Sequence, residues 1–232
     1  MDNYPDLRLK FYSLLKIIFK YCFESILALN DAQTKMMVDS VIWAMRHLHS
    51  EVADLGMDIF LVMLVNYHTS VKCNHFFQNY MLTLVQELLA VLTDTFHKGQ
   101  FKLHAMSLQR FIIIASSPNL TVQLWNSGMG SFKSNSEFIH SHMINLLRAA
   151  FPNVHPNEVK TFVDGLYQYQ REPKNFKQYI RDFIIQTKEF SNLDNQELYR
   201  EEQQQQQAQQ QQAEDLEKKD QDEASALLPA PE

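Results

Sequence analysis

The sequence predicts an all-α protein, and three observations lead to this. Only five glycines and seven prolines occur among 232 residues, so few positions interrupt a helix. Leu, Met, Gln, Lys and Glu are plentiful, and these unbranched side chains lose little rotamer freedom in a helix. Apolar residues also recur at helical spacing almost from the first residue. With 45% hydrophobic residues, the chain can bury a sizeable core.

The apolar spacing predicts eight helices, some with recognisable start signals. Asn30 with Gln33 and Ser134 with Glu137 match the capping box, in which two side chains bind unpaired backbone N–H groups at a helix start. Prolines stand at two other expected starts, where the missing N–H costs nothing. The predicted helices cover residues 6–29, 31–49, 51–70, 73–98, 101–117, 135–151, 156–170 and 173–190.

Consecutive pairs of these helices suggest a repeat. The pairs begin near residues 6, 51, 101 and 156, which is close to the ~40–47 residues of HEAT-type helical hairpins. The long loop expected at residues 116–135 lengthens the third unit. A plain bundle of eight helices has similar spacing, but the pattern favours a HEAT-repeat α-solenoid.

The first helix is apolar around most of its surface. Its polar residues fall on one narrow stripe, formed by Ser13, Lys16, Lys20 and Glu24. The remaining surface carries Leu7, Phe11, Leu14, Leu15, Ile17, Ile18, Tyr21, Cys22 and Phe23. Such a helix needs neighbours on two sides, whereas the terminal repeat of a complete solenoid has a polar outer face. We therefore expect the array to begin before Met1, unless this helix is the central element of a compact bundle.

The composition changes after residue 195. We expect helical repeats over residues 1–195 and a Gln-rich, acidic tail over residues 196–232, partly helical or disordered. Residues 201–232 carry nine carboxylates and two lysines, a balance of −7, which leaves about +1 for residues 1–200. A neutral body gives no footprint for nucleic acid, and an acidic tail repels anionic lipid. No apolar run is long enough to insert into a membrane.

The residues suited to catalysis or metal binding form no recognisable pattern. His47 with His49 and His140 with His142 have two-residue spacing, which places the imidazoles on different faces of a helix. His104 is expected to cap a turn together with His97. The two cysteines, Cys22 and Cys73, are expected to be buried free thiols, and Trp43, Phe60, Phe76, Phe77 and Tyr80 to lie mostly in the core. The sequence therefore predicts no enzyme, no metal and no cofactor.

Several segments resemble the C-terminal region of the exportin-1 family of nuclear export receptors. The resemblance extends from about Tyr4 to Glu202, and its motifs are specific in combination. They are Asp39–His47 (DSVIWAMRH), Val52–Gly56 (VADLG), Phe77–Tyr80 (FQNY), Val91–Thr95 (VLTDT), Leu146–Pro152 (LLRAAFP), Val159–Leu166 (VKTFVDGL), Asn175–Phe183 (NFKQYIRDF) and Gln186–Phe190 (QTKEF).

The resemblance implies that this chain is the closing arc of a much longer, ring-shaped receptor. Such receptors shuttle between nucleus and cytoplasm and carry leucine-rich export-signal cargo together with the GTP-bound GTPase Ran. Nucleoporins are further expected partners. The cargo groove and the principal Ran-binding repeats of the family have no counterpart here. A stand-alone helical-repeat scaffold without transport activity is the alternative.

The tail departs from the family pattern, because a Gln run replaces a more mixed, charged helix. No residue-level role is therefore carried over. Concentrated charge near the chain's end still suggests that the tail regulates cargo binding by autoinhibition. The candidate residues are Glu214, Asp215, Glu217, Asp220, Asp222 and Glu223.

Overall fold

The computed structural model describes residues 5–94 and 98–187. By its internal contacts the chain divides into Met1–Glu189 and Phe190–Glu232, and every described residue belongs to the first unit. All of the elements in these two described ranges are helical. They are α1 (Pro5–Tyr21), α2 (Phe23–Leu27), α3 (Asp31–Met45), α4 (Ser50–Thr69), α5 (Cys73–Leu92), α6 (Phe101–Ala115), α7 (Asn135–Ala150), α8 (Pro156–Gln168), α9 (Pro173–Thr187), and the short 3₁₀ turns Lys98–Gln100 and Ser127–Met129.

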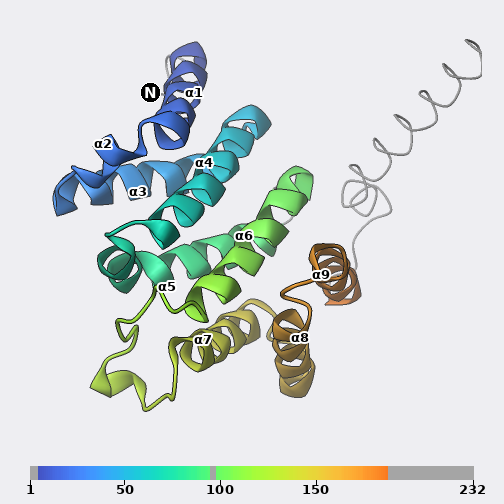
Figure 1. Cartoon of the computed structure of the whole chain (residues 1–232). Helices are drawn as coiled ribbons and strands as arrows, with labels where there is room; N and C mark the ends of the chain where they lie inside the picture. The colour runs from blue at the N-terminus through green and yellow to red at the C-terminus, as the bar shows by residue number, and fades with distance from the viewer. Residues whose placement is uncertain (1–4, 95–97, 188–232) are drawn as a thin grey trace, which may run out of the picture. The chain divides into compact units, whose positions relative to one another are not determined.

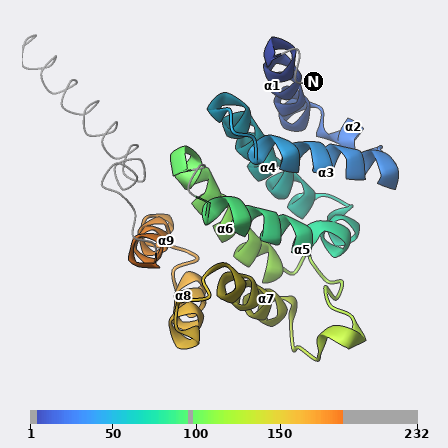
Figure 2. The ribbon, with the colours of Figure 1, turned by 180° about the vertical axis from the view of Figure 1, so that it is seen from behind.

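The helices of the first unit stack in two layers, as in a HEAT-repeat solenoid (Figure 1). One layer contains α1, α4, α6 and α9, and each helix packs against the next in that order. The second layer contains α3, α5 and α7, as the reverse view also shows (Figure 2). Helix α8 packs against α7 and α9. The all-α prediction and its repeat architecture are confirmed.

The pairing of the helices differs from the one expected from the sequence. Helix α3 packs far more extensively against α4 than α4 does against α5, and α5 packs more against α6 than α6 does against α7. The hairpins are therefore α3 with α4, α5 with α6, and α7 with α8. The expected pairs were wrong by one helix, because spacing reveals the period of a repeat but not its first member. Helix α1 is left without a hairpin partner among the described residues.

The predicted helix over residues 6–29 is divided at Cys22, which has φ −127° and ψ 33°. Helix α1 ends at Tyr21, and the Asn66 side chain of α4 donates a 2.7 Å hydrogen bond to the carbonyl of Phe19 in its last turn. The change of direction brings Phe23 edge-on to Tyr67 of α4, with ring centroids 5.1 Å apart. Packing against α4 thus decides the break, and neither Gly nor Pro marks it in the sequence.

The predicted helix starts are mostly confirmed. Asn30 and Gln33 form the complete capping box of α3, with hydrogen bonds of 2.9 and 3.1 Å. Ser134 accepts the backbone N–H of Glu137 at 3.1 Å, but the Glu137 carboxylate binds the N–H of Lys133 instead of that of Ser134. The second capping box is therefore incomplete, because its Glu side chain binds the N–H of the residue before the N-cap. Prolines open both α8 and α9, as expected.

The core is aromatic and most tightly packed around α4. The rings of Tyr67 and Phe76 stack at 3.6 Å, and burial raises the pKa of Tyr67 to about 12. At Gly56 the backbones of α3 and α4 approach so closely that a Cβ would lie 2.5 Å from the backbone nitrogen of Met45. Only glycine fits there. The close contact between α3 and α4 at this position therefore requires a residue without a Cβ atom.

Two of the expected core residues are on the surface. Cys22 is exposed, because the chain turns at that residue, whereas Cys73 is buried and burial raises its thiol pKa. Trp43 is 42% exposed on the outward side of α3, while Phe60, Phe76 and Phe77 are fully buried as predicted. The exposed tryptophan marks a surface that the sequence pattern did not identify.

Candidate functional site

The six acidic residues proposed for regulation, Glu214, Asp215, Glu217, Asp220, Asp222 and Glu223, lie outside the described residues. The site must therefore be sought among the surfaces of the helical stack. Three places are notable: an apolar face on α1, a groove beside Trp43, and a pocket at the α6–α7 loop.

The histidines occupy separate structural positions. The rings of His47 and His49, just beyond the end of α3, lie 6.4 Å apart. His140 contacts Asp164 at 2.7 Å and packs edge-on to Tyr167. His104 does not cap a turn, since it is 1% exposed inside α6. Over residues 5–94 and 98–187, no three His, Cys, Asp or Glu side chains gather as metal ligands do.

Helix α1 presents an apolar stripe, which we call the α1 face: Leu7, Phe11, Leu14, Ile17 and Tyr21. These side chains are between 39% and 70% exposed, although they are large and apolar. Tyr12 and Phe19, on the opposite side of the helix, are buried at 2% and 0%. Contiguous exposed apolar surface of this kind marks an interaction site.

On the side opposite the α1 face, an aromatic contact joins α1 to α3. Tyr12 stacks near Trp43 with ring centroids 6.2 Å apart, and its hydroxyl donates to the carbonyl of Ser40 at 3.0 Å. The guanidinium of Arg8 lies 5.4 Å from the Trp43 ring centre. The same group contacts Nε2 of His47 at 2.7 Å, and because arginine only donates, Nε2 accepts. These contacts fix α1 against α3 and hold the α1 face in one orientation.

A groove of about 650 Å³ lies between α3 and α5 on the second layer. Ile42, Trp43 and Leu48 give it an apolar floor, and the last of these is 81% exposed. An ion pair between Arg46 and Glu87 at 2.7 Å closes one side.

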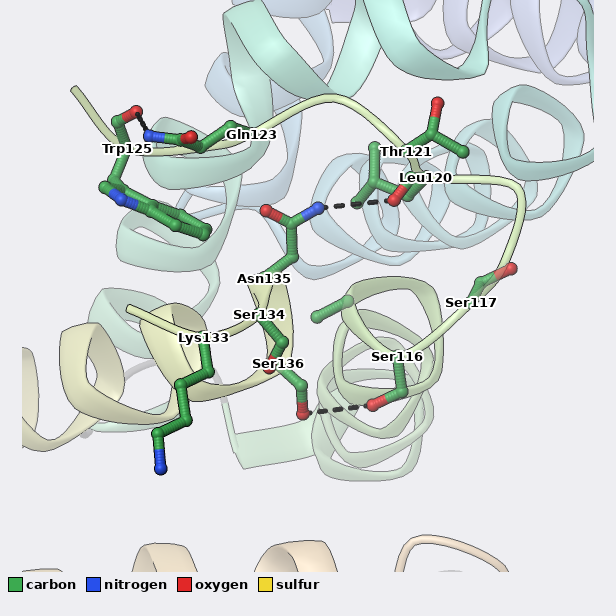
Figure 3. A pocket seen from close by; sticks show the side chains of 11 residues that line it. Ser116, Ser117, Leu120, Thr121, Gln123, Trp125, Lys133, Ser134, Asn135 and Ser136 are labelled. Carbon is green, nitrogen blue, oxygen red and sulfur yellow. Dashed lines mark hydrogen bonds between the residues drawn. The ribbon is translucent and has the colours of Figure 1, made fainter. Parts of the chain in front are cut away.

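The third place is a polar pocket of about 590 Å³ under the α6–α7 loop (Figure 3). Asn135, the first residue of α7, organises it. Its amide nitrogen donates to the carbonyls of Leu120 and Val122 at 3.3 and 2.8 Å, and its oxygen accepts from the N–H of Leu124 at 3.1 Å. Ser116 and Ser136 share a 3.1 Å hydrogen bond across it. The pocket's polar groups thus bind one another and stabilise the loop.

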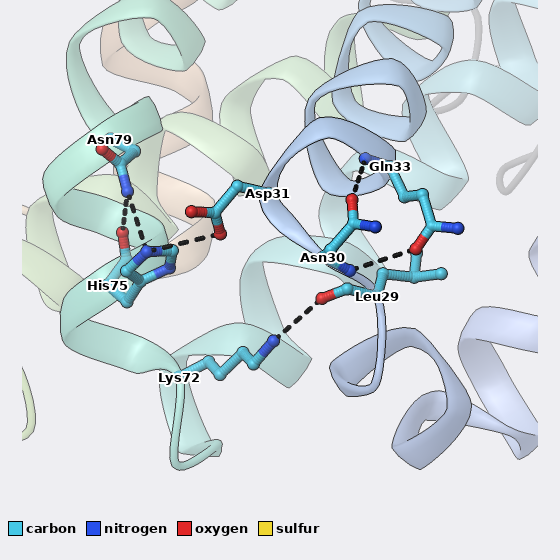
Figure 4. A network of polar contacts seen from close by, with 7 residues as sticks. All are labelled: Leu29, Asn30, Asp31, Gln33, Lys72, His75 and Asn79. Carbon is cyan, nitrogen blue, oxygen red and sulfur yellow. Dashed lines mark hydrogen bonds and ion pairs between the residues drawn. The ribbon is translucent and has the colours of Figure 1, made fainter.

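A polar network joins the first turn of α3 to the first turns of α5 (Figure 4). Lys72 donates to the carbonyl of Leu29 at 3.0 Å, and His75 lies 3.5 Å from the Asp31 carboxylate. Asn79 donates to the backbone carbonyl of His75 at 2.8 Å. These exposed contacts set the register of successive helices of the second layer, so their role is structural.

No helix within the described ranges is both long and apolar enough to cross a membrane. Sequence reasoning identified the apolar α1 correctly but missed Trp43 and Leu48. These two side chains are exposed because no other helix covers them among the described residues, and the apolar spacing of a sequence does not show which helices will pack together.

Comparison with known proteins gives a consistent family assignment. A family model described as "CRM1 C terminal" matches residues 1–192. Protein EXPORTIN 1A of Arabidopsis thaliana is 43% identical over 203 residues, which is 87% of this chain and 19% of that protein. Exportin-1 of Schizosaccharomyces pombe is 36% identical over 205 residues, 87% of this chain and 19% of that protein. Exportin-1 of Drosophila melanogaster is 34% identical over 203 residues, 87% of this chain and 18% of that protein. The chain therefore spans less than a fifth of the length of these relatives.

Proposed function

This chain belongs to the CRM1 C-terminal family, the C-terminal region of exportin-1, and from that premise we propose that it acts as part of a nuclear export receptor. In this proposal it closes the solenoid of a longer, ring-shaped receptor that shuttles between nucleus and cytoplasm. It binds partners and performs no catalysis. Residues 1–195 supply the helical repeats and residues 196–232 the tail.

The α1 face is the observation that carries the proposal. Helices α4 and α6 of the same layer each have a hairpin partner, whereas α1 has none among the described residues. Its exposed leucine and aromatic side chains match the surface that a preceding hairpin would bury, because each repeat of a solenoid contacts only its neighbours. The relatives are about five times longer, and this supports a role inside a larger array.

The expected partners are Ran-GTP and proteins with leucine-rich export signals, bound through the whole receptor. A flexible ring with two states would bind both partners in the same state, so each would strengthen the binding of the other. Nucleoporins are further expected partners, and the Trp43 groove offers them an apolar surface. No direct contact with nucleic acid or lipid is expected from a body whose charge is near zero.

An antibody against residues 5–187 tests the proposal through the size of the endogenous protein. We expect a band several times heavier than 27.2 kDa, which co-purifies with Ran loaded with a non-hydrolysable GTP analogue. Ran loaded with GDP is the matched control. A band at 27.2 kDa without Ran would exclude export as this protein's own activity and leave the scaffold alternative.

The tail is proposed to disfavour the cargo-binding state of the receptor. In a full-length receptor that carries this C-terminal region, removal of the residues after Asn195 should tighten the binding of an export peptide without Ran. Replacing Glu214, Asp215, Glu217, Asp220, Asp222 and Glu223 by Gln or Asn should have the same effect if charge is responsible. Fluorescence anisotropy of a labelled peptide measures both, and an unchanged Kd contradicts autoinhibition.

A further inference from the structure

Ser117 lies at the start of the α6–α7 loop, shortly after the end of α6 at Ala115. We infer that Ser117 is a phosphorylation site for a proline-directed serine kinase, and that the side chains of His68 and Arg110 hold the phosphate once it is attached. This inference goes beyond the proposed export function and does not rest on it. It follows from the sequence at Ser117, from the groups beside its hydroxyl and from the space in the adjoining pocket.

The pair Ser117-Pro118 has the sequence that a proline-directed kinase selects. It is the only place among the 232 residues where serine or threonine is followed by proline. Proline fixes its own φ and keeps the residue before it out of the helical conformation. Ser117 accordingly lies outside α6 and is partly exposed, and its neighbours Ser116, Pro118 and Asn119 are exposed. The serine is therefore presented on irregular, accessible backbone.

Two side chains that can carry positive charge already lie beside the Ser117 hydroxyl. Nε2 of His68, on α4, is 2.8 Å from Oγ of Ser117. Burial lowers the pKa of His68, and the positive charge of Arg110 on α6 lowers it further, so Arg110 is near the same ring. Over residues 5–94 and 98–187, no carboxylate forms an ion pair with His68 or Arg110. A phosphate on Ser117 would give both side chains an anionic partner.

The pocket under the loop has room for the phosphate. Ser117 is one of the residues that line this space of about 590 Å³, and its hydroxyl points away from the hydrogen bond between Ser116 and Ser136 (Figure 3). The described residues that line the pocket include Lys133 and no carboxylate. A dianion can therefore be accommodated there without meeting an acidic side chain.

The transfer needs Mg-ATP and the kinase as co-reactants. The bond between the γ-phosphorus and the bridging oxygen of ATP breaks, and ADP leaves with the electron pair. A new bond joins the γ-phosphorus to Oγ of Ser117, and the hydroxyl proton goes to a base of the kinase. The product carries a charge of about −1.5 to −2 at pH 7 and three strong acceptor oxygens.

Two opposing contributions decide how the phosphate changes stability. Ser117 follows the C-terminal end of α6, and His68 is in the last turn of α4, so the phosphate lies near the negative ends of two helix dipoles. Each of these changes the unfolding equilibrium constant by less than about fivefold. A charge-assisted hydrogen bond changes it by about tenfold or more, and His68 and Arg110 can each supply one. Phosphorylation should therefore stabilise the chain and fasten the start of the α6–α7 loop to α4.

Treatment of the whole folded chain with Mg-ATP and a mitogen-activated protein kinase, which is proline-directed, tests the site. Mass spectrometry of the intact chain and of its fragments should show one phosphoryl group, on Ser117. Ser117→Ala removes the hydroxyl and Pro118→Ala removes the recognition residue, so both variants should stay unmodified. Ser116→Ala is the matched control and should be phosphorylated like the wild type. No phosphorylation of the folded chain, or phosphorylation at another residue only, would overturn the inference.

Urea denaturation of the phosphorylated and unmodified chains tests the role of His68 and Arg110. We expect phosphorylation to lower the unfolding equilibrium constant by about fivefold, as the contributions above combine. This gain should shrink in His68→Gln, in Arg110→Gln and at 1 M salt, which screens exposed charges. Arg148→Gln, at an exposed arginine near the far end of α7, is the control and should keep the gain. A destabilised phosphoprotein, or a gain that neither His68→Gln nor Arg110→Gln reduces, would overturn the inference.

Discussion

Helices α1 and α4 are neighbours in the same layer, and both are apolar around most of their surface, but their surroundings differ. Helix α4 lies between α1 and α6 and against α3, so Ile59, Phe60, Met63 and Leu64 are fully buried. Helix α1 has α4 on one side only, and Leu7 and Tyr21 remain exposed at 59% and 70%. The same kind of sequence is thus core in one place and exposed surface in the other. The difference shows that in stacked repeats the number of neighbours decides a residue's role.

The largest effect should come from removing a ring on α4. Phe60 is fully buried and packs edge-on to Phe111, with centroids 6.0 Å apart. Phe60→Ala should lower the free energy of unfolding by about 3–5 kcal/mol, since it leaves a cavity in a closely packed core. Phe11→Ala, on the half-exposed side of α1, should cost less than about 1 kcal/mol. Urea denaturation of the two variants measures the contrast, and equal losses would refute the different roles assigned to the two helices.

The addition of a methyl group at Gly56 of α4 should have the next largest effect on stability. Gly56→Ala would place a Cβ 2.5 Å from backbone nitrogen of Met45, which cannot move without shifting α3. We expect a loss of about 1–3 kcal/mol, despite alanine's better helix propensity. Ser13→Ala on the exposed side of α1 is the control and should be neutral or slightly stabilising. A neutral result for Gly56→Ala in thermal unfolding would show that the two helices can separate without cost.

Acidification should weaken the packing of α4 and α7, because each carries a histidine whose pKa is lowered. Burial lowers the pKa of His68 in α4, with a smaller contribution from Arg110, and burial also lowers the pKa of His142 in α7. Because these folded-state pKa values lie below the unfolded value of about 6.5, the unfolded chain binds protons first. The stability that the neutral rings provide is present above pH 6.5 and is lost as the pH falls through their lower folded pKa values.

Urea midpoints at pH 7.5 and 5.5 measure this dependence. We expect the wild type to be less stable at pH 5.5. His68→Gln keeps a side chain able to bind Ser117, which contacts His68 at 2.8 Å, but it cannot titrate. This variant should therefore lose part of the pH dependence. If both His68→Gln and His142→Gln kept the pH dependence of the wild type, other titrating groups would be responsible for it.

The smallest effect should come from the ion pair that joins the two helices. Lys16 of α1 pairs with Asp58 of α4, and both side chains are more than one-third exposed. Solvent screens such a pair, so we expect a coupling energy of about 0.2–1 kcal/mol. A double-mutant cycle with Lys16→Met and Asp58→Asn measures it. Salt at 1 M should remove most of the coupling, whereas persistence at that salt concentration would indicate a packing effect.

The sequence could predict the helices but not their partners. Periodicity placed the starts of α3 to α9 within one residue, and the cap at Asn30 was recognisable from side-chain chemistry alone, but α5 ends at Leu92 where the predicted helix continued to residue 98. The break at Cys22 was missed, because it is made by Asn66 and Tyr67 across the layer. For the same reason the hairpin pairing was wrong by one helix. Exposure at Trp43 depends on which neighbours are present, and a local pattern carries no information about them.

The loop between α6 and α7 has a practical consequence. One side chain, Asn135, binds three backbone groups between Leu120 and Leu124 and thereby fastens the loop near its base. Farther along the loop, Ser127–Met129 form an exposed turn and Gly130 has φ +106°, while Trp125 and Phe132 on either side of it pack against Phe138 of α7. A fluorescent reporter or an affinity handle inserted there should leave the repeats undisturbed. That position offers a way to follow this region in living cells.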